Sequence, residues 1–161
     1  MPKIEKILFV CAGNTARSPA AEYLAKYYAR KYNVNLHFDS CGFFNAFSYM
    51  QPESKEYLDL KGIKSSDFRP KILNRTLLEK QDLIITMERS QSNDIIKNFP
   101  YISNIDKKTF TLKEFNEETS DLDITDPYYT NQTVYMKVLN IIDKNVENMI
   151  KKIIEMNKQR Y

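Results

Sequence analysis

Hydrophobic residues are concentrated in two nearly continuous runs, KIEKILFV at 3–10 and DLIITM at 82–87. Such runs are typical of central strands that are covered on both faces of a sheet. Two further stretches, VNLHFDS at 34–40 and KKTFTL at 107–112, have the composition of strands. The pattern therefore predicts four strands.

Helical patterns lie between and after these runs. The shorter predicted helices cover residues 18–32, 52–61, 72–80 and 89–98. The first begins with Ser18 as N-cap and Pro19 at the first helical position. The second begins at Pro52 and ends before Gly62, which is a typical C-terminal cap.

The clearest helix is the last one, where apolar residues recur at three- and four-residue steps with Lys, Asp and Glu between them. These residues are Val134, Val138, Ile141, Ile142, Val146, Met149, Ile150, Ile153 and Ile154. This stripe predicts core packing. Alternation of strands and helices without a linker or repeat predicts one α/β domain over residues 1–161. We expect three layers, with a central four-stranded parallel sheet and helices on both faces.

Composition narrows the class of protein. A chain of 161 residues, with 42% hydrophobic and 28% charged residues, has room for one domain with a proper core. The net charge of +3 is too small to indicate a nucleic-acid partner. No apolar run approaches the roughly 20 residues that cross a bilayer, and no export signal is recognisable. Two cysteines are too few for a disulfide scaffold, which favours a reduced, cytoplasmic setting.

The most informative stretch is LFVCAGNTARSPAAEYL, residues 8–24, because it places Cys11 where the first strand ends. Parallel sheets bind ligands at this end of their strands. Gly13 and Asn14 tolerate positive φ, so the loop can turn successive N–H groups inward as an anion nest. The next helix adds its free N–H groups, and Arg17 adds a planar fork suited to phosphate oxygens.

A thiol in such a positive field loses its proton easily and becomes a nucleophile. The C-x5-R spacing therefore predicts a phosphate cradle with a thiolate at its floor. The alternative is a buried structural cysteine, since a lone C-x5-R occurs by chance in many chains.

A second motif, DITDPYY at 123–129, supplies a candidate acid. Pro127 holds Asp126 in a rigid loop, and Tyr128 and Tyr129 are suited to the wall of a pocket for an aromatic ring. An ordinary Asp-Pro turn is the alternative. The single histidine, His37, falls in a predicted strand, which leaves no Cys-His protease or zinc site to expect.

VCAGNTARSPAAE followed downstream by DPYY resembles the low-molecular-weight protein tyrosine phosphatase family, whose signature is V-C-x-G-N-x-x-R-S-P. The chain matches every fixed position of that signature. The segments 39–43, 67–73 and 82–90 also resemble blocks of the family. The resemblance implies the fold called phosphotyrosine protein phosphatase I-like.

The resemblance also implies roles for individual residues. Cys11 would be the nucleophile that forms a phosphocysteine intermediate, and Arg17 would bind the phosphoryl oxygens. Asn14 would hold the loop in its left-handed shape, and Ser18 would donate a hydrogen bond to the thiolate. Asp126 would act as general acid and then as general base. The phosphate-binding loop would consist of Ala12, Gly13, Asn14, Thr15, Ala16, Arg17 and Ser18.

No metal and no cofactor are expected. The expected partners are phosphorylated proteins, small phosphomonoesters and phosphate-like anions, with no membrane or nucleic acid, and the expected state is a monomer.

Three positions depart from the family pattern. Many relatives have a second cysteine where this chain has Ala16, so the familiar vicinal disulfide cannot form. Cys41 replaces the usual alanine of a Ser-Ala-Gly turn, where it either lies close enough to protect Cys11 or is buried packing. Phe68 stands where many relatives have a histidine, so one support of the loop must differ.

Substrate choice is less determined. Thr15 follows the arginine phosphatases that share the fold, whereas Tyr128 and Tyr129 follow the tyrosine-specific members. The segment FFNAFSYMQP at 43–52, with Phe44 and Phe47, is expected to form the opposite wall of the cleft.

We take phosphotyrosine as the first prediction and protein-arginine phosphatase as the alternative. An arsenate reductase is a poor match because no cysteine follows Cys41. A non-catalytic phosphate-binding module remains a further alternative.

Overall fold

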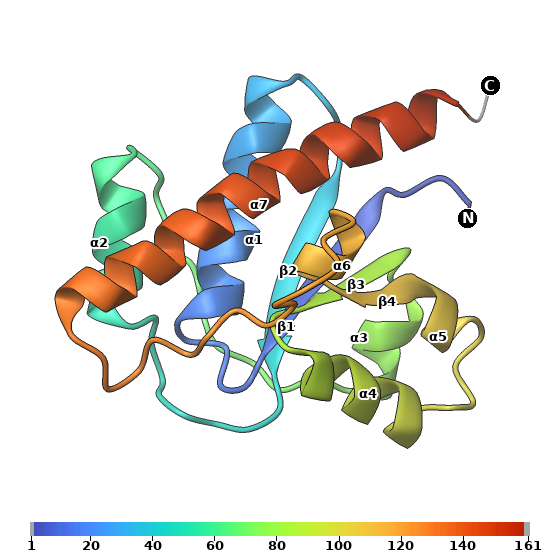
Figure 1. Cartoon of the computed structure of the whole chain (residues 1–161), viewed down its shortest axis with the longest axis horizontal. Coiled ribbons are helices and arrows are strands. Elements are labelled where there is room, and N and C mark those ends of the chain that lie inside the picture. Colours follow the sequence, from blue (N-terminus) through green and yellow to red (C-terminus); the bar gives the residue numbers. More distant parts are fainter. Residues whose placement is uncertain (1, 160–161) are drawn as a thin grey trace.

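The chain forms one parallel sheet of four strands, in the order β2-β1-β3-β4 (Figure 1). The structure is a computed structural model that describes residues 2–159. The strands are β1 (Lys6–Cys11), β2 (His37–Gly42), β3 (Leu83–Thr86) and β4 (Thr109–Thr111). The four predicted strands and their parallel arrangement are confirmed.

Seven helices surround the sheet within the described residues: α1 (Arg17–Lys31), α2 (Pro52–Leu60), α3 (Arg75–Glu79), α4 (Arg89–Asn98), α5 (Ile105–Lys108), α6 (Leu112–Phe115) and α7 (Gln132–Lys158). On one face, α1, α2, α6 and the long α7 contribute side chains to the main core cluster. On the other face, α3, α4 and α5 form a second cluster. The three-layer architecture is confirmed (Figure 1). No helix between residues 2 and 159 is long and apolar enough to cross a membrane.

β1 shows why its sequence is continuously apolar. Ile7 and Phe9 join the core on the α1 and α7 side, whereas Leu8 and Val10 join the core on the α3 and α4 side. A strand in the middle of a covered sheet buries both of its faces, so polar alternation is absent.

The two cysteines lie in different layers. Cys11 belongs to the core on the α1 side, and Cys41, which pairs in register with Val10, belongs to the opposite core. Cys41 is completely buried, and burial raises the pKa of its thiol well above the usual range. The structure thus favours buried packing over protection of Cys11.

One predicted helix start is wrong. Helix α1 begins at Arg17, with Ala16 as N-cap and no side-chain cap, so Ser18 is not the N-cap and Pro19 is not the first helical residue. The Ser18 hydroxyl is instead hydrogen-bonded inside the loop that precedes the helix. The Ser18 hydroxyl contacts Cys11 and Asn14, so it does not take the N-cap role that its residue type predicts.

The end of α2 agrees with prediction. Gly62 has φ of +74°, its N–H donates to Asp59, and the next N–H donates to Leu58. This is the Schellman arrangement that glycine favours. Helix α3 begins later than predicted because Asn74 caps it, its side chain accepting the Leu77 N–H at 2.8 Å.

Candidate active site

The loop between β1 and α1 is held against the end of β2. Asn14 occupies the left-handed region with φ of +54°, as its residue type allows. A Cβ on Gly42 would lie 2.8 Å from backbone atoms of Ala12 and Asn14, and one on Gly13 would lie 2.6 Å from the Ala46 Cβ. Glycine is therefore required at both positions because neighbouring atoms leave no room for a Cβ. Gly13 does not have a positive φ, so backbone conformation is not the reason there.

The side chains inside this loop form a directed hydrogen-bond network. Asn14 Nδ2 donates to Ser18 Oγ at 2.8 Å and to Ser40 Oγ at 2.9 Å, while its Oδ1 accepts the Lys71 N–H at 3.1 Å. Ser18 Oγ lies 2.9 Å from Cys11 Sγ. Ser18 accepts a hydrogen from Asn14, and its own proton has two acceptors within reach, the Cys11 sulfur and the more distant carbonyl oxygen of Cys41 at 3.4 Å. The sulfur is the nearer of the two.

A second group of residues supports the network from outside. Ser40 Oγ donates to Glu22 at 2.5 Å, and Glu22 pairs with Lys26 at 2.7 Å. Phe68 packs edge-on against Tyr23, with ring centroids 6.1 Å apart. Its phenyl side chain has no polar atom and takes no part in the hydrogen-bond network. The sequence predicts a different support at Phe68 but contains no signal for Ser40 and Glu22. The register of β2 beside the loop brings these two residues within reach.

Arg17 is held deep in the site, with 2% of its side chain exposed. One guanidinium nitrogen donates to Glu88 at 2.7 Å and to the carbonyl oxygen of Ile124 at 2.7 Å. Glu88 in turn forms a capping box at the start of α4 with Gln91. The role of Glu88 was missed, although a carboxylate directly after the third strand lies at the sheet edge where ligands bind.

Asp126 lies on the other side of the same guanidinium. Its Oδ2 is 3.7 Å from the second terminal nitrogen of Arg17, and its Oδ1 accepts the Tyr128 N–H at 3.1 Å. Asp123 accepts the Arg89 N–H at 2.8 Å, and Asp121 lies 3.6 Å from Lys113. Of these three carboxylates, Asp126 alone lines the cavity.

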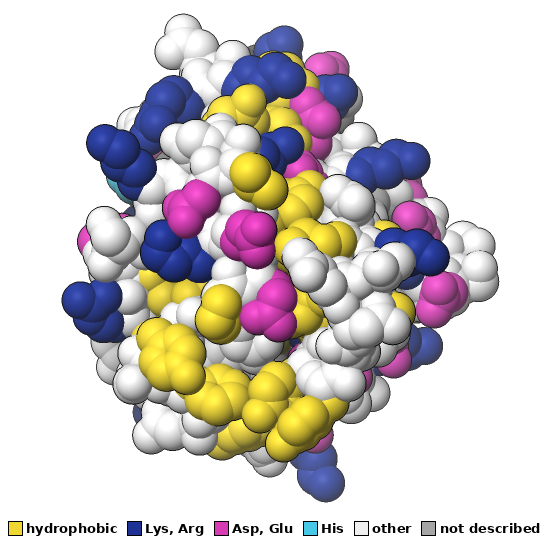
Figure 2. Space-filling view, turned by 90° about the vertical axis from the view of Figure 1, so that its left-hand side faces the viewer, with side chains coloured by type: hydrophobic (Ala, Val, Ile, Leu, Met, Phe, Trp, Pro, Cys, Tyr) yellow, Lys and Arg dark blue, Asp and Glu magenta, His cyan; other side chains and the backbone are white. Residues whose placement is uncertain are grey.

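A cavity of about 380 Å³, called the active-site cavity below, opens above Cys11. Its lining consists of Cys11, Ala12, Gly13, Thr15, Ala16, Arg17, Phe44, Ala46, Phe47, Gln51, Asp126 and Tyr128. The structure thus brings together predicted residues from three distant segments. Figure 2 views the side on which α2 and the start of α7 lie, and hydrophobic side chains gather along its lower edge.

Tyr129 does not line this cavity, contrary to the expectation. Its side chain is 91% exposed, and its ring lies against that of Tyr128, with centroids 4.0 Å apart. Tyr128 meets Phe47 edge-on at 5.4 Å and so completes the wall. Tyr129 has a positive φ of +68°, and its ring packs on the Tyr128 ring outside the cavity.

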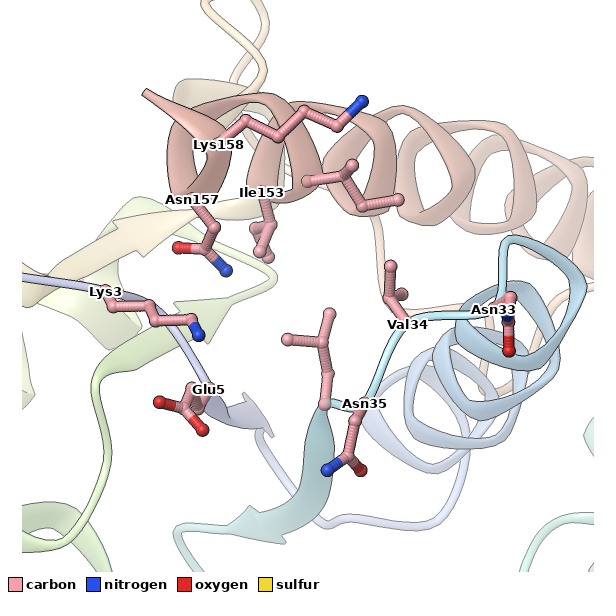
Figure 3. Close-up of a pocket in the computed structure, with 10 residues that line it drawn as sticks. Lys3, Glu5, Asn33, Val34, Asn35, Ile153, Asn157 and Lys158 are labelled. Carbon is pink, nitrogen blue, oxygen red and sulfur yellow. The ribbon is translucent and has the colours of Figure 1, made fainter. Parts of the chain in front are cut away.

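A larger cavity, of about 510 Å³, lies elsewhere (Figure 3). Figure 3 shows Lys3 and Glu5, on the segment before β1, across the cavity from Ile153 and Asn157 on α7. It contains none of the predicted site residues, so the chemistry is assigned to the smaller cavity. Between residues 2 and 159, no group of three His, Cys, Asp or Glu is placed to hold a metal ion.

A thiol, an arginine and a carboxylate around one anion-sized loop define the site of a phosphoryl-transfer protein. Comparison with known proteins agrees, because residues 6–160 match the model of the low molecular weight phosphotyrosine protein phosphatase family. The chain belongs to this family.

Relatives carry two kinds of name. The chain is 31% identical over 153 residues to the low molecular weight protein-tyrosine-phosphatase Ptp of Acinetobacter johnsonii, covering 94% of this chain and 99% of that protein. It is 30% identical over 148 residues to a protein-arginine-phosphatase of Bacillus subtilis (strain 168), covering 91% and 95%.

A solved structure is also similar. It is a cysteine-to-serine mutant of the YwlE arginine phosphatase with a phosphorylated active site serine. The TM-score is 0.83 at 29% identity, over 92% of this chain and 95% of that chain.

Proposed function

We propose that this protein is a protein phosphatase that hydrolyses phosphotyrosine through a phosphocysteine intermediate on Cys11. The observation that carries the proposal is the position of Cys11 at the floor of a cavity that Arg17 and Asp126 also line. Aromatic side chains of Phe44, Phe47 and Tyr128 form the walls of the cavity, where a phenyl ring fits.

In the first step, the Cys11 sulfur attacks phosphorus. The S–P bond forms while the bond from phosphorus to the tyrosyl oxygen breaks, and Asp126 gives its proton to that oxygen. Arg17 and the loop N–H groups neutralise the charge that spreads over the phosphoryl oxygens. The partly buried ion pair with Glu88 keeps the guanidinium in place for this task.

In the second step, water attacks the phosphocysteine. Asp126 takes a proton from that water, the S–P bond breaks, and inorganic phosphate leaves. The Ser18 hydroxyl, 2.9 Å from the sulfur, stabilises the departing thiolate. The phosphorylated serine of the similar YwlE mutant supports a covalent phosphoenzyme at this position.

The proposed reaction uses no metal and no cofactor, since Arg17 and backbone N–H groups supply the positive field. The proposed substrates are phosphorylated proteins or small phosphomonoesters, handled by a monomer in the cytoplasm. The low cysteine content, two in 161 residues, supports a reducing compartment.

Phosphoarginine is a second candidate substrate. It is supported by the relatives named as arginine phosphatases and by the Thr15 side chain, a polar group among the rings of the cavity. On this substrate, the bond that breaks joins phosphorus to a guanidine nitrogen, and Asp126 protonates that nitrogen.

One experiment tests the proposal. Phosphotyrosine and phosphoarginine peptides are offered side by side in the presence of a chelator, and the reaction is quenched with denaturant for mass spectrometry. We expect turnover in chelator and a phosphoryl group on the peptide that contains Cys11. Turnover that requires added metal, or a phosphoryl group that never appears on Cys11, would contradict the mechanism.

A further inference from the structure

Beside the aromatic rings, Thr15 and Gln51 bring neutral hydrogen-bonding side chains to the active-site cavity, and both are almost wholly buried. The two candidate substrates differ in the group next to phosphorus. Phosphotyrosine has an ester oxygen there, which only accepts hydrogen bonds, whereas the guanidine of phosphoarginine presents N–H donors. The hydrogen-bond polarity of Thr15 therefore bears on which substrate the site holds.

Thr15 is the first member of a chain of four contacts that leads away from the cavity. In the structure, Gln51 Nε2 donates to Thr15 Oγ1 at 3.1 Å, and Tyr135 Oη donates to Gln51 Oε1 at 2.9 Å. Tyr135 Oη lies 2.8 Å from Ser54 Oγ, which lies 3.0 Å from the carbonyl oxygen of Ala16. Burial raises the pKa of Tyr135 well above its usual value, so its hydroxyl keeps one proton to donate.

The number of protons favours one orientation of the Gln51 amide. When the Gln51 nitrogen faces Thr15, three contacts depend on the hydroxyl protons of Tyr135 and Ser54: Tyr135 with the Gln51 oxygen, Tyr135 with Ser54, and Ser54 with the Ala16 carbonyl. Each hydroxyl has one proton, so one of the three contacts lacks a proton. A turned amide occupies the same volume and removes this conflict. Thr15 then donates to the Gln51 oxygen, and the Gln51 nitrogen donates to Tyr135. Tyr135 donates to Ser54, and Ser54 donates to Ala16.

Every contact in the turned orientation has one proton. One additional buried hydrogen bond favours it about fivefold. In this orientation the proton of Thr15 is engaged by Gln51, so only oxygen lone pairs of Thr15 face the cavity.

We propose that Gln51 is a positioning residue that makes the Thr15 hydroxyl a hydrogen-bond acceptor and so lets the cavity hold the guanidine N–H groups of phosphoarginine. The inference rests on the proposed function and defines one part of its substrate choice. Arg17 and the loop still bind the phosphoryl group, which both substrates share. The effect of Gln51 therefore falls on the ratio of the two activities.

The test measures kcat/KM for phosphoarginine divided by kcat/KM for phosphotyrosine. Gln51→Met keeps the volume but releases the Thr15 proton, so we expect this ratio to fall about five- to tenfold, as for the loss of one hydrogen bond. Ser54→Ala removes the acceptor of the Tyr135 proton, which then goes to the Gln51 oxygen and returns the amide nitrogen to Thr15. A similar fall is expected, although Ser54 does not line the cavity.

Ser65→Ala is the matched control, because Ser65 is a buried serine whose Oγ has no hydrogen-bond partner among the described residues. Its ratio should equal that of the wild type. Unchanged ratios in both Gln51→Met and Ser54→Ala overturn the inference.

A nuclear Overhauser experiment on the wild-type protein tests the orientation independently of activity. The side-chain amide protons of Gln51 should show contacts to the Tyr135 ring, and contacts to the Thr15 methyl group in their place overturn the inference. A protein that hydrolyses phosphotyrosine but not phosphoarginine also overturns it, while the proposed function stands. A protein that hydrolyses neither contradicts the proposed function itself.

Discussion

The floor of the active-site cavity is made of side chains withdrawn from solvent, whereas its rim is made of rings that stand in solvent. Cys11, Asn14 and Ser18 are buried and joined by hydrogen bonds, and each polar group has a defined partner. At the rim, Phe44 and Tyr128 are exposed, and the Tyr128 ring packs edge-on against Phe47. Buried hydrogen bonds specify one geometry, while exposed rings permit several. The residues that carry out the chemistry are therefore held in one geometry, whereas the rings that contact the substrate can adopt several.

The largest effect is expected at the floor. Cys11→Ser should abolish turnover, because a serine hydroxyl in this position is a far weaker nucleophile than a thiolate. The variant should still fold and bind inorganic phosphate, as measured by thermal melting with and without phosphate. Cys41→Ser is the control, since Cys41 lies in the opposite core layer, and it should retain activity. Near-normal turnover in Cys11→Ser would remove the thiolate mechanism.

Asp126→Asn should have the next largest effect. General acid catalysis contributes about 10²–10⁴-fold, so kcat on phosphotyrosine should fall by that factor. The loss should shrink along a series of aryl phosphates as the pKa of the leaving phenol falls, because less proton transfer is needed.

Asp123→Asn is the matched control, since Asp123 caps the Arg89 N–H outside the cavity. It should lower the melting temperature and leave the leaving-group dependence unchanged. An equal loss for every leaving group in Asp126→Asn would assign the acid role to another residue.

Glu88→Gln should have an intermediate effect. The hydrogen bond to Arg17 loses its charge, and hydrogen bonds to charged groups contribute about 1.5–3 kcal/mol, so kcat/KM should fall about ten- to hundredfold. Glu114→Gln changes a second capping-box glutamate, in α6, and should leave kcat/KM unchanged. Phosphate affinity should fall together with kcat/KM in Glu88→Gln. Loss of stability without loss of phosphate affinity would show that Glu88 only caps α4.

The smallest effects are expected at the rim. Tyr128→Ala should raise KM for phosphotyrosine about three- to tenfold with little change in kcat, since an aromatic contact contributes about 0.5–1.5 kcal/mol. Tyr129→Ala is the neighbouring control and should stay within about twofold, because its ring stands outside the cavity. A larger effect in Tyr129→Ala than in Tyr128→Ala would reverse the assignment of the wall.

The floor could be predicted from sequence because it is contiguous. Cys11, Arg17 and Ser18 lie within one short segment, so the local conformation of the loop brings them together with little help from distant parts of the chain. The sheet was predictable for a related reason, since a continuous apolar run is stable only when both faces are covered. The capping role assigned to Ser18 was wrong because a tertiary hydrogen bond outweighed a local preference.

Residues that support the floor from distant segments could not be predicted. Glu88 and Ser40 lie in segments that resemble blocks of the family, and Gln51 lies in the expected wall segment, but the sequence assigned none of them a role. Their contacts depend on strand register and on where each loop crosses the end of the sheet. Tyr128 and Tyr129 are the same residue type in one motif, so the sequence could not tell which of them lines the cavity. In the structure Tyr128 lines it, and Tyr129, which has a positive φ, stands in solvent.

By itself, the sequence determined the order of the four strands and the five longer helices along the chain, and the loop that holds the nucleophile; the short helices α5 and α6 on either side of β4 were not predicted. The order and the loop both follow from short-range constraints, namely hydrophobic periodicity and the few conformations open to a Gly-Asn turn. The tertiary structure alone decided which carboxylate faces Arg17, which ring faces the substrate and which amide holds Thr15. Those choices depend on side chains that are far apart along the chain and meet only when the layers pack, because a hydrogen bond requires its two atoms within about 3 Å.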